Sequence, residues 1–149
     1  MKNVFYISIG SNIKKEKNIK KCARFLKKEF KKISFSRVFE TKPVGFQNQE
    51  NFLNAVARAE TKKSIFRVKK GLAQIEKKLK RKRTKIKSGP RTIDLDIIIW
   101  NKKTVDKNAA ASYNLPGLRE VLVFGEADKK IEKKLAKLQK MPKATRIFL

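Results

Sequence analysis

The sequence predicts one α+β domain in which two helices cover one face of an antiparallel sheet. Three observations support this fold class. Segments rich in β-branched and aromatic residues alternate with two amphipathic segments, in the order strand, helix, strand, strand, helix, strand. A chain of 149 residues is long enough to bury the core of one ordinary domain, which we expect to span the whole chain. No apolar run approaches the roughly 20 residues that cross a bilayer, so we expect no membrane partner.

The first part of the chain supplies a strand, a helix and a second strand. Residues 4–9, VFYISI, favour a strand that ends at the turn signal GSN. A helix is predicted over residues 15–32, because apolar residues recur at helical spacing, at Ile19, Cys22, Leu26 and Phe30. Residues 33–40, ISFSRVFE, alternate as in a second strand, which would place on one side Ile33, Phe35, Arg37 and Phe39.

The next part supplies a long loop, a strand, a helix and another strand. The loop TKPVGFQNQEN is longer than an antiparallel connection needs, which indicates a function. The strand FLNAVARAE follows it, and Ser64 then caps a helix whose apolar stripe is Ile65, Val68, Leu72, Ile75 and Leu79. The basic loop KRKRTKIKSGPR leads to a strand over residues 92–100. This order is the β-α-β-β-α-β arrangement of ferredoxin-like folds, to which we add a short helix over residues 128–140.

The formal net charge of +27 is the strongest compositional signal. A polyanionic partner such as nucleic acid would explain it. The alternative is that Lys serves as the solvated residue on nearly every helix face, as in NIKKEKNIKK, and then the charge indicates no partner.

A single cysteine and the absence of histidine limit the chemistry. Cys22 cannot form an internal disulfide, and its place on the apolar stripe of a predicted helix favours a core thiol in a reducing cytoplasm. Without His the chain lacks the usual general base at neutral pH and the commonest transition-metal ligand. Any catalysis must therefore depend on carboxylates, Lys, Arg, hard metal ions and positioning.

The stretch SGPRTIDLDIIIW places two carboxylates inside a hydrophobic strand. Asp94 and Asp96 are two residues apart and share a face, opposite the face predicted for Ile93, Leu95, Ile97 and Ile99. Adjacent carboxylates repel one another, and Mg²⁺ with phosphate oxygens would relieve that repulsion. Basic residues that suit phosphate precede the pair, at Arg81, Arg83, Lys85, Lys87 and Arg91. The alternative is a solvated strand face with no metal.

Phe52 and Asn54 form a second candidate pair. They share one face of their strand, whereas Ala55 and Ala57 share the other and would let a helix pack closely. An aromatic ring and a side-chain amide suit a flat heterocycle, through stacking and hydrogen bonds to its edge. The alternative is an exposed Phe beside a structural Asn.

Several segments of the sequence, in unbroken order over residues 3–100, resemble the 6-hydroxymethyl-7,8-dihydropterin pyrophosphokinases of folate biosynthesis. KSGPRTIDLDII resembles the signature of that family, and YISIGSN resembles its first strand and turn. FSRVFETKPVGFQNQENFLNAVARAET is similar to its second strand, substrate loop and third strand, and QIEKKLKRKR is similar to its second helix and basic loop.

The resemblance implies that pyrophosphate passes from ATP to the hydroxymethyl oxygen of the pterin and that AMP leaves. It implies two Mg²⁺ ions held by Asp94 and Asp96, with catalytic roles for both and for Arg81 and Arg91. The implied ATP contacts are Glu76, Arg81, Arg83, Arg91, Ile97 and Arg119. The implied pterin contacts are Gly10, Thr41, Pro43, Val44, Phe52 and Asn54.

Residues 101–149 depart from the family pattern. Members usually carry a Pro-His segment followed by an Arg and an aromatic residue, whereas this chain has NLPGLREVLVF, with Pro116 but no His. Arg119 is expected to replace the phosphate-contacting Arg, and Val121 or Phe124 is expected near the place of the aromatic residue. The departure therefore keeps open a relative with impaired turnover that serves as a binding protein.

A second alternative is a basic ferredoxin-like domain that binds RNA through aromatic residues of its sheet. Such a domain needs its aromatics within RNP-type strand motifs, and the aspartate pair would repel phosphate in the absence of metal. We therefore expect small-molecule substrates, no specific nucleic acid, and a monomer.

Overall fold

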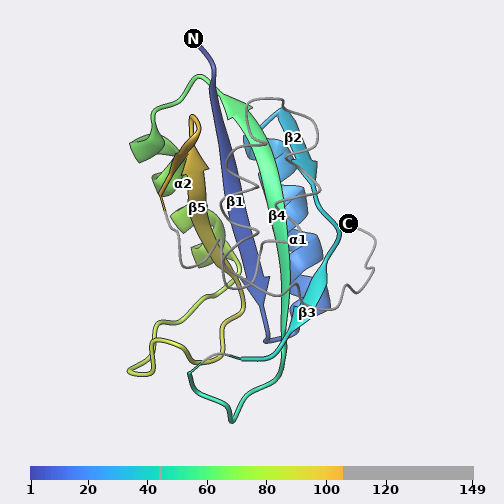
Figure 1. The fold of residues 1–149 in the computed structure, drawn as a ribbon. Coiled ribbons are helices and arrows are strands. Elements are labelled where there is room, and N and C mark those ends of the chain that lie inside the picture. The colour runs from blue at the N-terminus through green and yellow to red at the C-terminus, as the bar shows by residue number, and fades with distance from the viewer. Residues whose placement is uncertain (44, 106–149) are drawn as a thin grey trace.

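The sheet and both helices fall within residues 1–43 and 45–105, the part of the chain that the computed structural model describes. The strands form one sheet in the order β2-β4-β1-β5-β6, with β3 also paired to β4, and every pairing is antiparallel. Both helices lie on the same face of this sheet (Figure 1). The predicted α+β fold with a ferredoxin-like core is therefore confirmed.

The elements follow the predicted order with small changes of boundary. Their bounds are β1 Asn3–Ser11, α1 Lys15–Glu29, β2 Lys32–Phe35, β3 Phe39–Thr41, β4 Phe52–Thr61, α2 Ile65–Lys78, β5 Asp94–Trp100 and β6 Lys103–Thr104. The hairpin strand β6 was not predicted, and the helix predicted over residues 128–140 lies outside the described residues.

The core lies between the sheet and the helices. The strand residues that face the helices include Phe5, Ile7, Ile9, Leu53, Ala55, Ala57, Ala59, Leu95 and Ile97. The helices contribute Ile19, Cys22, Leu26, Val68, Leu72 and Ile75. The small alanines of β4 leave room for close helix packing, and each large side chain buried here contributes about 1.5–3 kcal/mol.

Both helices begin at the predicted residues, but α1 ends earlier than predicted. The Ser64 side chain accepts a hydrogen bond from the amide of Arg67, which confirms the predicted cap of α2. The chain leaves α1 at Glu29 rather than near residue 32, because Phe30 is extended and inserts into the core against the ring of Phe5. Burial raises the pKa of the Cys22 thiol to about 12, as expected of a core cysteine.

The predicted second strand is interrupted by a one-residue bulge. Phe35 pairs with Ala57 and Phe39 pairs with Asn54, so the first strand uses one residue more than its partner over this interval. The amide of Ser36 donates to the carbonyl oxygen of Val56. The prediction that Phe35 and Phe39 share a face is therefore wrong.

A consequence of this bulge is that Val38 joins the core, whereas Phe39 lies on the opposite face of the sheet, beside Asn54.

A second irregularity changes the end of β5. Ile97 pairs with Ile7, but Ile99 pairs with Tyr6 and the extra residue between them is Ile98. Ile99 therefore lies on the face away from the helices, and the prediction that it lines the core with Ile97 is wrong. Trp100 takes that place and packs on Phe5 at a ring distance of 5.1 Å.

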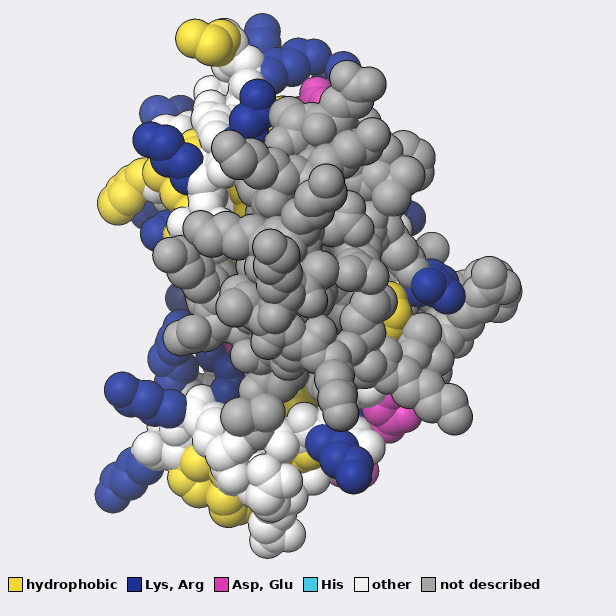
Figure 2. Space-filling view, in the orientation of Figure 1, with side chains coloured by type: hydrophobic (Ala, Val, Ile, Leu, Met, Phe, Trp, Pro, Cys, Tyr) yellow, Lys and Arg dark blue, Asp and Glu magenta, His cyan; other side chains and the backbone are white. Residues whose placement is uncertain are grey.

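Lysine and arginine side chains occur at several separate places on the surface seen in Figure 2, rather than in a single patch. Across residues 1–43 and 45–105, no helix combines the length and apolarity that spanning a membrane requires.

Candidate functional site

The candidate site lies on the face of the sheet away from the helices, near the C-terminal end of β1. Gly10 pairs with Asn54 of β4 on one side and with Asp94 of β5 on the other. Two residues earlier in β1, Ser8 pairs with Asp96. Residues that pair across antiparallel strands share a face, so the aspartate pair and the pair Phe52 and Asn54 lie on the same face. The two predicted half-sites are therefore neighbours.

Asp94 lies at the centre of a cluster of arginines. Arg81 Nη1 donates to Asp94 Oδ1 at 2.7 Å, and Arg91 Nη1 donates to Asp94 Oδ2 at 2.6 Å. Glu76, on α2, accepts a further hydrogen bond from Arg81 Nη1. The side chains of Arg81 and Arg91 are only 12% and 18% exposed, so these ion pairs are well shielded from water.

Local backbone contacts hold both arginines in place. The chain turns just after α2, where the amide of Arg81 donates to the carbonyl oxygen of Glu76 at 3.1 Å. The guanidinium of Arg91 also donates to the carbonyl oxygens of Lys87 at 2.6 Å and Gly89 at 3.3 Å. These bonds use several donors of the planar guanidinium at once, which a lysine ammonium would not reproduce.

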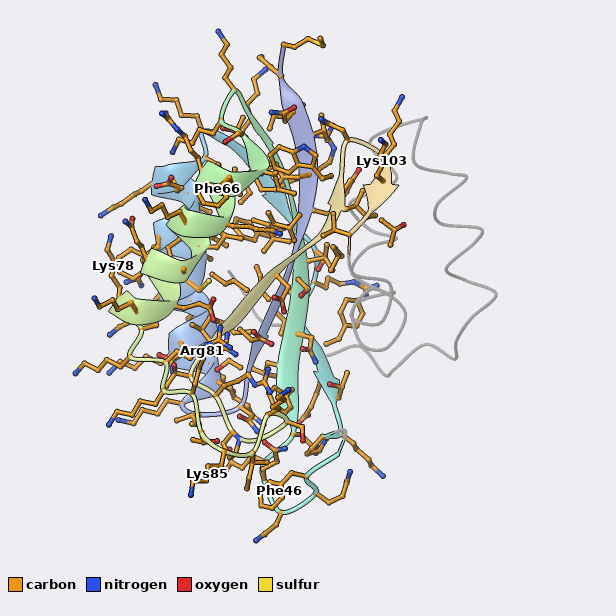
Figure 3. The ribbon with its side chains drawn as sticks, turned by 90° about the vertical axis from the view of Figure 1, so that its left-hand side faces the viewer. Phe46, Phe66, Lys78, Arg81, Lys85 and Lys103 are labelled. Atoms are coloured by element: carbon orange, nitrogen blue, oxygen red, sulfur yellow. The ribbon has the colours of Figure 1, made fainter. Side chains whose placement is uncertain are left out.

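A cavity of about 440 Å³ opens beside this cluster. Its lining includes Arg81, Arg83, Lys87, Arg91, Asp94 and Asp96. Figure 3 shows Arg81 below α2, and it shows Lys85 and Phe46 on two loops at the same end of the molecule. The volume lies within the range of about 300–1,000 Å³ that small-molecule sites occupy.

The aromatic and amide half of the site is ordered by its own contacts. Asn54 Nδ2 donates to Thr41 Oγ1 at 2.5 Å, and both residues are buried. A Cβ atom added to Gly10 would lie 3.0 Å from Asn54 Oδ1, so glycine allows the amide to approach β1 closely. The guanidinium of Arg91 lies 5.8 Å from the centre of the Phe52 ring and thereby links the two halves.

The remaining predicted site residues do not all lie at the cavity. Pro43 is buried and Arg83 is exposed at the cavity. Ile97 is buried on the helix side of β5, and its contact with ATP stays a prediction. Val44 and Arg119 lie outside the described residues.

Sequence reasoning missed the residues that join the loops around the site. Asn12 Oδ1 accepts a hydrogen bond from the amide of Arg91 at 2.9 Å, and Asn12 Nδ2 donates to Gln49 Oε1 at 2.8 Å. Gln49 Nε2 donates to the carbonyl oxygen of Ser88 at 2.6 Å. The only signal in the sequence was the density of amide side chains in QNQEN and of turn residues in GSN.

The carboxylates of Asp94 and Asp96 are ligands that suit Mg²⁺. Asp94 and Asp96 supply hard carboxylate oxygens on one face of a strand, and Mg²⁺ commonly uses one or two carboxylates together with phosphate oxygens and water. Within the described ranges no cluster of three or more Asp, Glu or Cys side chains is arranged to hold a metal ion by itself. A metal here would therefore take the rest of its ligands from a bound phosphate compound and water.

The fold and the site define an α+β protein whose sheet presents an arginine and carboxylate cluster beside an aromatic ring and a buried amide. Residues 6–120 match the family model described as 7,8-dihydro-6-hydroxymethylpterin-pyrophosphokinase (HPPK), and the chain belongs to this family. The resemblance seen in the sequence is thereby confirmed.

Several relatives have the name 2-amino-4-hydroxy-6-hydroxymethyldihydropteridine pyrophosphokinase. The chain is 34% identical to the protein from Bacillus subtilis over 71% of its own length and 65% of the relative. It is 38% identical to the protein from Aquifex aeolicus, over 67% and 62%, and 33% identical to the protein from Helicobacter pylori, over 73% and 69%. The chain thus spans a little under two thirds of the length of the first two relatives.

Proposed function

We propose that the protein transfers pyrophosphate from ATP to the hydroxymethyl group of 6-hydroxymethyl-7,8-dihydropterin and releases AMP. The observation that carries this proposal is the position of Gly10 between Asn54 and Asp94 in neighbouring strands. This arrangement places the Asn54 amide, which suits the edge of a heterocycle, near the Asp94 and arginine cluster, which suits phosphates. The family membership and the names of the relatives support the same reaction.

The pterin binds on the side of Phe52 and Asn54. The ring of Phe52 stacks on the bicyclic heterocycle, and the Asn54 amide bonds its edge. Because Asn54 Nδ2 is already bonded to Thr41 at 2.5 Å, its Oδ1 atom is oriented before the pterin arrives. Such orientation reduces the entropy lost on binding and fixes the hydroxymethyl group toward β5.

The triphosphate of ATP binds in the cavity beside Arg81 and Arg91. The hydroxymethyl oxygen attacks the β-phosphorus and its proton passes to water, while the bond from that phosphorus to the bridging oxygen of the α-phosphate breaks and AMP leaves with the electron pair. Arg81 and Arg91 stabilise the negative charge on the transferring phosphates. The chemistry depends on positioning and charge, so a chain without His can perform it.

Mg²⁺, as two ions, would be held by Asp94 and Asp96 and supplies charge neutralisation and alignment when bound. Both carboxylate oxygens of Asp94 accept bonds from arginines at 2.6 and 2.7 Å. Each of these oxygens has a second lone pair, so Asp94 can accept from an arginine and still offer an oxygen to a metal ion. Asp94 would thereby bring Mg²⁺ and the two arginines together at the phosphates.

The test removes the carboxylate charge of Asp96 at the exposed edge of the cavity. Asp96→Asn keeps the shape of the side chain, and we expect AMP release with the pterin substrate to fall by about 1,000-fold or more, the value of several kcal/mol of charge stabilisation. Calorimetric titration with a non-hydrolysable ATP analogue is expected to show Mg²⁺-dependent binding in the wild type and its loss in the variant.

Glu60→Gln is the matched control, because this carboxylate lies on β4 at the opposite end of the sheet, opposite Val4 of β1. We expect it to keep wild-type turnover. Substrate binding without AMP release by the wild type would instead identify a binding protein with impaired turnover. Unchanged nucleotide binding in Asp96→Asn would contradict the metal role.

A further inference from the structure

Ser88 joins two loops that border opposite halves of the site. The amide of Phe46, in the β3–β4 loop, donates to Ser88 Oγ at 3.2 Å. Gln49 Nε2, in the same loop, donates to the carbonyl oxygen of Ser88 at 2.6 Å. Ser88 itself belongs to the α2–β5 loop, so both its hydroxyl and its backbone contact a segment about 40 residues away in the chain.

Gly45 provides the space in which the Ser88 hydroxyl sits. Its φ angle of +81° is one that side-chain-bearing residues rarely adopt. A Cβ atom at this position would also lie 2.6 Å from Ser88 Oγ and 3.1 Å from Ser88 Cβ. The backbone conformation and the close approach of Ser88 thus each require glycine, which identifies the contact as a tightly packed one.

Both loops lead directly to residues of the proposed site. Ser88 is three residues before Arg91, and the carbonyl oxygen of its neighbour Lys87 accepts a bond from Arg91 Nη2 at 2.6 Å. The β3–β4 loop ends at Phe52, the first residue of β4. The Ser88 contact therefore connects the segment that orients a phosphate-binding arginine to the segment that precedes the aromatic ring.

We propose that Ser88 is a positioning residue that couples the binding of the two substrates, an inference that rests on the proposed function. A substrate that orders one loop also orders the other through Ser88, and the second substrate then loses less conformational entropy. A hydrogen bond between neutral groups corresponds to about a fivefold change in an equilibrium constant. We expect the wild type to bind the pterin at least about fivefold more tightly in the presence of the nucleotide.

The experiment measures the affinity of 6-hydroxymethylpterin with and without a saturating non-hydrolysable ATP analogue and Mg²⁺. The ratio of the two affinities is the coupling factor. Ser88→Ala is expected to lower this factor about fivefold, while each substrate alone binds with nearly wild-type affinity. Gly45→Ala is expected to have the same effect, because its Cβ atom would displace the Ser88 hydroxyl.

Thr84→Val is the matched control for the loss of a hydroxyl. Thr84 belongs to the same loop as Ser88 and also lines the cavity, so its variant can change nucleotide affinity, but its Oγ1 atom donates to the carbonyl oxygen of Ile86 within that loop at 3.1 Å. We expect the coupling factor of this variant to equal that of the wild type. A merely structural role for Ser88 would weaken both affinities together and leave their ratio unchanged, and that result would overturn the proposal.

A second measurement needs no substrate. Hydrogen exchange of the Phe46 amide in the ligand-free full chain is expected to be about tenfold faster in Ser88→Ala than in the wild type or Thr84→Val, because that amide loses its acceptor. Unchanged exchange would refute the contact itself. If the wild type bound neither substrate, the proposed function and the coupling would both fall, whereas a wild type that binds both without coupling would contradict this inference alone.

Discussion

The two ends of the sheet both carry basic cavities, but the cavities differ in how their charges are held. The first, of about 440 Å³, contains the Arg81, Arg91 and Asp94 cluster. The second, of about 340 Å³, lies at the other end, and its lining is Lys2, Glu29, Phe30, Lys31, Lys32, Glu60, Thr61 and Lys62. Positive charge occurs at both, so charge alone does not distinguish a site in a chain with a net charge of +27.

The two cavities differ in how firmly their basic side chains are held in place. The side chains of Arg81 and Arg91 are 12% and 18% exposed, and each makes several hydrogen bonds. The Lys32 side chain, by contrast, is 65% exposed, and its ammonium lies 3.8 Å from the carboxylate of Glu60. A flexible exposed ammonium gives little orientation, whereas a shielded guanidinium with fixed donors is ready for a planar anion. Pre-positioned charge rather than total charge therefore distinguishes the candidate site from the second end.

The sharpest test of this comparison keeps the charge and changes the geometry. Arg91→Lys retains a cation but loses the planar donors that contact Asp94 and the carbonyl oxygens of Lys87 and Gly89. We expect kcat/KM for pyrophosphate transfer to fall about 100-fold, as when one oriented donor to a transition state is lost.

The control for Arg91→Lys is Lys32→Ala, which removes a whole charge from the second end. We expect its kcat/KM to stay within about twofold of the wild type, because long-range charge effects are screened over about 8 Å at physiological salt. If Lys32→Ala lowered the rate as much as Arg91→Lys, total charge would matter more than fixation and the comparison would fail.

A smaller effect on substrate binding is expected when one of two glycines is replaced by alanine, because the two glycines lie beside side chains of different rigidity. In Gly10→Ala the new Cβ would lie 3.0 Å from Asn54 Oδ1, and Asn54 is held by Thr41 at 2.5 Å. We expect the affinity for the pterin to fall about tenfold, as for a misplaced polar contact of about 1–3 kcal/mol, with nucleotide affinity nearly unchanged. Calorimetry with each ligand separately measures both.

Gly71→Ala is the comparison for Gly10→Ala at the other end. Its Cβ would lie 3.1 Å from Glu29 Oε1, the end of a side chain that lines the second cavity. Glu29 Oε1 is paired with Lys63 Nζ at 2.5 Å, but both side chains are long and partly exposed, at 33% and 43%, so the pair can shift together. Alanine also favours a helix by about 1 kcal/mol over glycine. We expect unchanged pterin affinity and an equal or higher melting temperature. A loss of affinity equal to that of Gly10→Ala would show that neighbour rigidity is not the cause.

Within the described residues, hydrophobic periodicity was sufficient to predict both helices, the strand segments other than β6, and the face of the aspartate pair. The periodicity indicates which residues of a strand share a face. The order of strands and helices along the chain then restricts the possible sheet topologies. It did not predict the bulges near Ser36 and at Ile98, because one inserted residue leaves the apolar character of the strand unchanged while it reverses every later side chain. Val38 and Ile99 were misassigned for this reason.

The contacts between loops could not be predicted from local pattern. Asn12, Gln49 and Ser88 meet across 37 to 39 residues of chain, and each is a common loop residue by itself. What makes them significant is the direction of their hydrogen bonds, which depends on the folded positions of all three loops. The resemblance to a family did locate five of the residues that line the cavity, namely Arg81, Arg83, Arg91, Asp94 and Asp96, although it gave no account of what holds them in place.

The smallest expected effect concerns the lysines of the second end. The pKa of Lys2 is lowered from its ordinary value of 10.5, because a hydrogen bond with the Lys32 side chain favours the neutral amine and the two positive charges repel one another. Below the folded-state pKa both the folded and unfolded chains are protonated at Lys2, so the repulsion destabilises the folded state. As the pH rises through the folded-state pKa toward 10.5, the folded chain releases its proton first, and stability rises.

Lys2→Gln should therefore raise the melting temperature slightly at neutral pH and remove part of this alkaline increase. Lys69→Gln, which removes an exposed lysine on α2, serves as the control for the change in net charge. Thermal unfolding followed by circular dichroism from pH 7 to pH 10 at low and high salt tests this, because salt should reduce the difference between exposed charges. A melting temperature lower than that of Lys69→Gln at neutral pH would mean that Lys2 is held by a favourable contact, and the second end would then resemble the first.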